Sequence, residues 1–123
     1  MSRSLYHSFA NAFHGLSYAL RYERNPQIHL AMALATVAVG LWLGLAPFEW
    51  AILVLTISAV LATELLNSAL ETLADATSPE YHPLVGIAKD VAAGAVLVIA
   101  IGAVAVGLLL FLPKLIAILD NIS

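Results

Sequence analysis

Side chains with oxygen atoms recur at helical spacing near the middle of the chain. Glu64, Asn67, Glu71 and Asp75 lie three or four residues apart. On a helix that turns by about 100° per residue they fall on one face. Three carboxylates on one face repel each other unless a cation lies among them. Mg²⁺ prefers such hard oxygen ligands and usually shares them with substrate phosphates. The spacing is therefore compatible with a metal-assisted phosphate site.

Two other interpretations of this face stay open at the level of spacing. In the first, Glu64 is a neutral, hydrogen-bonded packing residue, and Glu71 and Asp75 are solvated acids at a helix end. In the second, acids inside a membrane face a proton pathway, as in a transporter or a rotor subunit. The spacing alone does not separate these interpretations from a phosphate site.

The composition places these side chains in a membrane protein. Of 123 residues, 62% are hydrophobic and 11% are charged, whereas soluble domains have about 45–50% and about 25%. The net charge of −3 excludes the basic surface with which nucleic-acid-binding proteins neutralise phosphates. The sequence has no cysteine, which excludes disulfides and a cysteine nucleophile. We expect one membrane-embedded domain over residues 1–123.

Three segments are long and apolar enough to cross a bilayer, which takes about 20 helical residues. Charged residues are absent from 25–48, 50–63 and 91–113, which predicts spans at about 28–45, 50–74 and 91–112. The middle span reaches full length only if its helix continues through Glu64. Pro26 is expected to make Asn25 extended or turned and to open the next helix.

An amphipathic helix is predicted before the first span, at about residues 4–22. Its apolar residues recur every three or four positions, which is typical of a helix lying in the membrane interface; they are Leu5, Phe9, Phe13, Leu16 and Leu20. The predicted fold is therefore all-α and integral to the membrane, with an N-terminal surface helix and three transmembrane helices.

The basic residues predict the topology. Arg3, Arg21, Arg24 and Lys89 lie on one side of the predicted spans, and Lys114 lies on the other. Because cytoplasmic segments are enriched in Lys and Arg, we expect a multi-pass protein with a cytoplasmic N-terminus and 75–90 loop, and with its C-terminus outside.

Two long motifs resemble the signature of the prokaryotic diacylglycerol kinase family. They are Glu64-Leu65-Leu66-Asn67-Ser68-Ala69-Leu70-Glu71 and the segment from Ser78-Pro79-Glu80-Tyr81-His82-Pro83 through Lys89-Asp90 to Leu97. Glu23-Arg24-Asn25 with Ile28-His29 also matches, so the resemblance covers nearly the whole chain. It implies a homotrimeric lipid kinase of the bacterial inner or plasma membrane that transfers the γ-phosphoryl group of MgATP to a lipid hydroxyl.

The resemblance also implies roles for individual residues. Glu64 matches the general base of the family, and Glu23 and Glu71 match its Mg²⁺ ligands. Asp90 is expected to orient Lys89 or to cap the third transmembrane helix. The site of the family lies between protomers, so Glu23 is expected to serve a neighbouring chain. The complete predicted ATP-binding set is Glu23, Asn67, Glu71, Asp75, Glu80, Tyr81, His82, Lys89 and Asp90.

The Arg24-Asn25 pair and the run from Ser78 to Pro83 are more similar to the branch that phosphorylates undecaprenol than to the diacylglycerol branch. We therefore expect conversion of undecaprenol to undecaprenyl phosphate, with diacylglycerol as the alternative substrate. The expected partners are the lipid alcohol, ATP, membrane lipids and further copies of the chain, and not nucleic acid. The competing class is a non-enzymatic membrane protein, such as a proton-conducting or scaffold subunit. His7, His14 and His29 form no metal-ligand spacing and are interpreted as surface or headgroup-facing residues.

Overall fold

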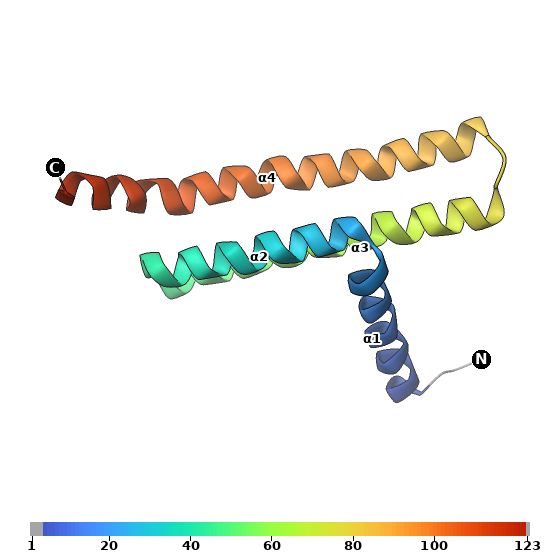
Figure 1. The fold of residues 1–123 in the computed structure, drawn as a ribbon, viewed down its shortest axis with the longest axis horizontal. Helices are drawn as coiled ribbons and strands as arrows, with labels where there is room; N and C mark the ends of the chain where they lie inside the picture. Colours follow the sequence, from blue (N-terminus) through green and yellow to red (C-terminus); the bar gives the residue numbers. More distant parts are fainter. Residues whose placement is uncertain (1–3, 123) are drawn as a thin grey trace.

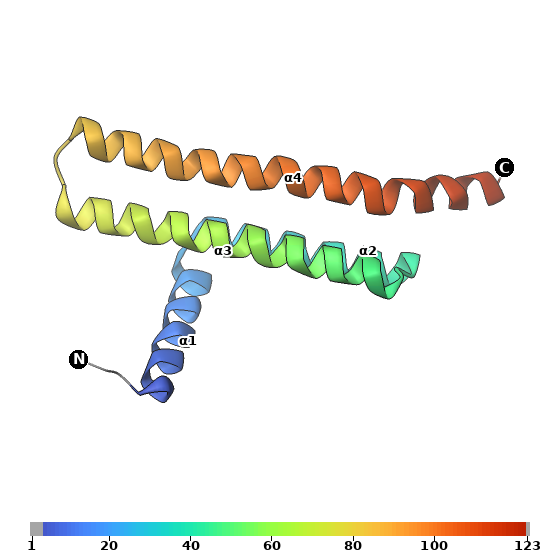
Figure 2. The same ribbon diagram turned by 180° about the vertical axis from the view of Figure 1, so that it is seen from behind.

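A computed structural model describes residues 4–122 as four helices (Figure 1). They are α1 (Leu5–Tyr22), α2 (Arg24–Leu43), α3 (Pro47–Thr77) and α4 (Pro83–Ile122). Helices α2, α3 and α4 run side by side, and α1 projects from them at a steep angle in both views (Figures 1 and 2). Arg3, one of the basic residues that predict the topology, lies outside the described residues.

Helices α2, α3 and α4 are each long and apolar enough to cross a membrane, as the sequence predicts. At 1.5 Å per residue, α3 is about 46 Å long and α4 about 60 Å, whereas a hydrocarbon core is about 30 Å thick. Both helices are therefore longer than the hydrocarbon core is thick. Large apolar side chains are exposed along their outer faces, for example Leu55, Leu66 and Leu97. The chain is accordingly a multi-pass membrane protein.

Glu23 forms the junction between α1 and α2. Its backbone is extended (φ −106°, ψ 128°), and its N–H donates to the carbonyl of Ala19. The sequence-based break at Asn25 is wrong, because α2 already begins at Arg24. Pro26 fits inside the first turn of α2, where a backbone N–H has no partner within the helix in any case.

The side chain of Gln27 fixes the end of α1 against the start of α2. Its Nε2 donates to the carbonyl of Leu20 at 3.0 Å and to that of Arg21 at 3.1 Å. The last carbonyls of a helix lack partners within that helix, so these two bonds satisfy groups that would otherwise need water. They also hold α1 at its angle to α2 (Figure 1).

Two glycines near the end of α2 have different functions. Gly44 ends α2 with φ +74°, a conformation that L side chains rarely adopt. Gly40 lies under the ring of Trp50, where an added Cβ would lie 2.9 Å from the ring atom Cη2. Only Gly40 is therefore small for reasons of packing.

The best-packed region lies near this turn. Leu45, Leu53 and Leu110 are buried together, and they join the α2–α3 connection to α4. On the same side of the molecule, Glu49 accepts a hydrogen bond from the N–H of Ala46 and pairs with Lys114 at 3.1 Å. Helix α3 packs most extensively on α4, so one long antiparallel pair positions the polar residues at its opposite end.

Candidate active site

The polar face of α3 runs from a buried to an exposed end. Glu64 is 2% exposed and Asn67 is 8% exposed, whereas Glu71 and Asp75 are exposed. From residue 64 to residue 75 this face is about 16 Å long at 1.5 Å per residue. One helix therefore links a dehydrated carboxylate to a solvated, acidic end.

Glu64 lies between α2 and α3 with only one of its two oxygens in contact with a polar group. Its Oε2 is 3.4 Å from Nε2 of His29. Within residues 4–122, Glu64 Oε1 and Asn67 Oδ1 are buried without a hydrogen-bond partner. Unsatisfied buried oxygens are rare in folded proteins, and a catalytic role or a bound water or ion accounts for some of them. Glu64 Oε1 can take up a proton, and both atoms can accept a hydrogen bond from a bound group.

Lys89 joins the exposed end of this face to α4. Its Nζ donates to Asp75 Oδ1 at 2.6 Å. Lys89 lies outside the predicted spans, and the hydrogen bond to Asp75 raises the pKa of its ammonium group; the charges of Asp75 and Glu71 add to this effect. An ammonium group has three donors, so two of them are left for a phosphate.

The connection between α3 and α4 is held by local hydrogen bonds. The Ser78 hydroxyl donates to the carbonyl of Glu80 at 3.2 Å. The N–H of Leu84 donates to Nδ1 of His82 at 3.1 Å, so the His82 ring caps the start of α4. With Nδ1 as the acceptor, the neutral ring has its proton on Nε2, which is left for a ligand.

A cavity of about 160 Å³ lies at this connection. Its lining brings together five predicted ATP-binding residues, and these are Asp75, Glu80, Tyr81, His82 and Lys89. Whole small-molecule pockets measure about 300–1,000 Å³, so this cavity has room for part of a nucleotide.

The structure corrects the two roles expected of Asp90. Helix α4 begins at Pro83, so Asp90 lies inside the helix and does not cap it. The partner of Lys89 is Asp75 rather than the neighbouring Asp90. The capping role of His82 is not predictable from spacing, because that role depends on where α4 begins.

The predicted metal ligands Glu23 and Glu71 lie on different elements. Glu23 is at the α1–α2 junction and Glu71 is on α3. Over residues 4–122, no group of three or more His, Asp or Glu side chains is arranged to hold a metal ion. The oxygen donors nevertheless suit Mg²⁺, which is usually bound by one or two carboxylates together with substrate phosphates and water.

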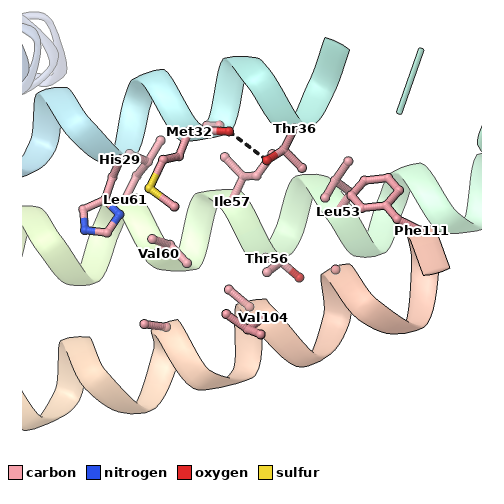
Figure 3. A pocket seen from close by; sticks show the side chains of 14 residues that line it. His29, Met32, Thr36, Leu53, Thr56, Ile57, Val60, Leu61, Val104 and Phe111 are labelled. Atoms are coloured by element: carbon pink, nitrogen blue, oxygen red, sulfur yellow. Dashed lines mark hydrogen bonds between the residues drawn. The ribbon is translucent and has the colours of Figure 1, made fainter. Parts of the chain in front are cut away.

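A second cavity, of about 320 Å³, lies between α2, α3 and α4 (Figure 3). Its lining is almost entirely apolar and includes Met32, Leu53, Val60, Val104 and Phe111. The hydroxyls of its two threonines donate to carbonyls of their own helices. His29 also lines it, so the group that contacts Glu64 faces an apolar, membrane-level cavity. The sequence predicts a surface or headgroup-facing position for His29, because nothing in its spacing indicates a contact with another helix.

The sequence is similar to known lipid kinases. The pattern of the family described as "Prokaryotic diacylglycerol kinase" matches residues 10–111. The undecaprenol kinase of Bacillus subtilis is 44% identical over 108 residues, which cover 88% of each chain. The diacylglycerol kinase of Synechocystis is 45% identical over 113 residues, which cover 91% of this chain and 65% of that enzyme. The diacylglycerol kinase of Escherichia coli K12 is 38% identical over 71 residues, 58% of each chain.

Proposed function

The chain belongs to the prokaryotic diacylglycerol kinase family and is a lipid kinase, and we propose that it phosphorylates undecaprenol to undecaprenyl phosphate at the cytoplasmic membrane surface. The family membership decides against the proton-conducting and scaffold alternatives. The observation that most supports the site is the buried Glu64 carboxylate with one unpartnered oxygen.

Undecaprenol is the proposed acceptor because the match to an undecaprenol kinase covers 88% of both chains. Diacylglycerol is the second candidate. It is favoured by the 45% identity to the Synechocystis enzyme, although the chain spans only 65% of that enzyme. Both lipids present one hydroxyl above a hydrocarbon tail, so the same base serves either acceptor.

Glu64 is the proposed general base. As the hydroxyl oxygen of the lipid attacks the γ-phosphorus of ATP, its proton passes to Glu64 Oε1, and the bond to the leaving ADP breaks. The 2% exposure of Glu64 supports this role, because water does not compete for the carboxylate. A positioned base of this kind typically accelerates proton transfer by about 10²–10⁴-fold.

The polar face of α3 suggests how ATP is oriented. The γ-phosphate has to lie near Glu64 and Asn67, and the cavity at the α3–α4 connection lies about 16 Å further along the helix. We place the nucleoside end of ATP in that cavity, next to Glu80, Tyr81 and His82. Lys89 lines the same cavity, and its ammonium group is the proposed point charge for the phosphates nearest the nucleoside.

Mg²⁺ is the proposed metal, and Glu71 and Glu23 are its proposed carboxylate ligands. When bound, Mg²⁺ neutralises charge on the phosphate oxygens. Asn67 Oδ1, which is buried and unpartnered in the described chain, is a further oxygen donor for the metal. Asp90 is exposed on α4 one residue after Lys89 and stays a proposed second contact to ATP.

The same proposal includes the orientation and the assembly. The distribution of basic residues supports a cytoplasmic position for the N-terminus and the α3–α4 connection. Helix α1 exposes Leu5, Phe9 and Phe13, which supports a position on the membrane surface with these side chains among the lipids. A homotrimer would cover part of the exposed apolar surface of α2–α4 and would bring Glu23 of one chain to α3 of another.

The test is a transfer assay with γ-labelled ATP in mixed micelles that contain undecaprenol, diacylglycerol or neither lipid. We expect labelled lipid with both alcohols and a higher kcat/KM for undecaprenol. A higher kcat/KM for diacylglycerol would favour the second candidate. Absence of labelled lipid with any alcohol would overturn the proposed function.

A further inference from the structure

We propose that His29 is a positioning residue for the general base: it holds Oε2 of Glu64, so that Oε1 is the oxygen that accepts the lipid proton. The inference rests on the proposed function and adds a residue to its machinery. Three observations support it, and they concern the contact between the two side chains, the unequal environment of the two carboxylate oxygens, and the cavity beside His29.

The first observation is the contact itself. His29 Nε2 lies 3.4 Å from Glu64 Oε2, and the side chains are 22% and 2% exposed. The separation is longer than the usual 2.7–3.2 Å for an N–H···O bond. Catalytic hydrogen bonds are often long in the absence of substrate and tighten when it binds. Nε2 of His29 faces the buried carboxylate from α2, and it can donate a hydrogen bond when it carries a proton.

The second observation is the difference between the two oxygens of Glu64. Oε2 faces His29, and Oε1 is buried without a partner among the described residues. A carboxylate that rotates freely can present either oxygen to the hydroxyl group of the lipid. A contact to Oε2 removes that freedom and leaves one oxygen for the hydroxyl proton. Holding the base in one geometry lowers the barrier because reacting groups need to be aligned.

The third observation is the position of His29 in the apolar cavity between α2, α3 and α4 (Figure 3). Thr36 and Thr56 bond to carbonyls of their own helices. Among the side chains of the cavity, His29 is the one with a polar group directed at another helix. It therefore lies between an apolar space at membrane level and the carboxylate that has to meet a lipid hydroxyl.

The step balances without a further reactant. The hydroxyl oxygen forms a bond to the γ-phosphorus, the bond from phosphorus to ADP breaks, and the hydroxyl proton moves to Glu64 Oε1. His29 keeps its own protons throughout and acts only through Glu64.

The decisive experiment compares His29→Phe, which removes the donor at similar size, with His29→Gln, which retains an N–H donor at the end of the side chain. We expect His29→Phe to lower kcat about tenfold, the lower end of the range for a hydrogen bond to a charged group, because the contact is long. His29→Gln should restore kcat to within about threefold of the native value, a partial rescue that a retained donor permits. The KM for ATP should be unchanged in both.

A double-mutant cycle separates positioning from a structural role. If His29 acts through Glu64, adding His29→Phe to Glu64→Gln should lower the residual rate no further. His14→Phe is the matched control, because His14 is exposed on α1, and its kinetics should be native. If His29→Phe fails to fold, His29→Asn takes its place, because the shorter Asn side chain does not reach Oε2 of Glu64. The kcat of His29→Asn should then be lowered as expected for His29→Phe.

Several results would overturn the inference. They are a native kcat in His29→Phe, a His29→Gln variant as slow as His29→Phe, or a full additional loss on the Glu64→Gln background. The proposed function has its own, distinguishable failures. One is a native enzyme that labels no lipid. The other is a Glu64→Gln variant that transfers phosphate at the rate of the native enzyme, with either His or Phe at position 29.

Discussion

Replacing Glu64 with Gln tests the proposed chemistry directly. Gln has nearly the same shape as Glu, so the substitution keeps the packing of a side chain that is 2% exposed and removes only the ability to take up a proton. A neutral amide also fits an apolar site at least as well as a carboxylate does, because burial disfavours charge. The variant should therefore fold and insert like the native chain.

The magnitude follows from the loss of a general base, which typically lowers the rate by about 10²–10⁴-fold. This range corresponds to about 2.7–5.4 kcal/mol of activation free energy. The burial of Glu64 favours the upper half of the range, because water at a 2% exposed position does not take over the proton efficiently. The KM for ATP should change little, since the role proposed for Glu64 is toward the lipid hydroxyl.

Initial rates of label transfer from ATP to undecaprenol measure the effect, and thermal unfolding in detergent confirms that the variant is folded. Glu49→Gln is the matched control, because it is the same change on the same helix. The Glu49 carboxylate pairs with Lys114, far from the candidate site, so the kcat of this variant should equal that of the native enzyme. A Glu64→Gln enzyme with a kcat within threefold of native would refute the assignment of the base.

Three further outcomes are expected. Lys89→Met should raise the KM for ATP about tenfold, the scale of one charge-assisted hydrogen bond, with little change for the lipid; an unchanged KM in initial-rate assays would contradict the phosphate contact. Gly40→Ala should destabilise the fold by about 1–3 kcal/mol through overpacking, because its Cβ would lie 2.9 Å from the Trp50 ring. If the variant unfolds in detergent at the same temperature as the native chain, the ring moves freely and the prediction is wrong. If sites are shared between chains, an equal mixture of Glu23→Gln and Glu64→Gln chains should recover about one quarter of native activity by random assembly. A mixture as inactive as its components would refute sharing.

The helices were largely predictable because their signals are local. Stretches without charge mark the three membrane-crossing helices, and Gly44 with Pro47 marks the turn between α2 and α3. The break between α1 and α2 was misplaced at Asn25, since proline is read from sequence as a boundary, whereas the first turn of a helix accepts it. The extension of α4 back to Pro83 was also missed. Its start depends on the His82 cap, which no hydropathy pattern encodes.

The site was predictable where one helix forms it and unpredictable where two helices meet. Helical periodicity alone places Glu64, Asn67, Glu71 and Asp75 on one face of α3. The contacts of Lys89 with Asp75 and of His29 with Glu64 join residues of different helices, and their register depends on packing. The spacing of His29 along the chain therefore led to a surface assignment, although its ring faces the most buried carboxylate of the described chain.

The burial pattern separates the part of the candidate site that one chain buries from the part that stays exposed. The fold of a single chain already dehydrates Glu64, so the proposed base does not need a neighbouring protomer for its environment. The nucleotide side differs: Glu71, Asp75, Glu80 and Tyr81 are exposed, and Glu23 lies at the α1–α2 junction. A second copy has most to add on that side. Changes at Glu64 should therefore alter turnover within each chain, whereas sharing between chains should be detected through Glu23.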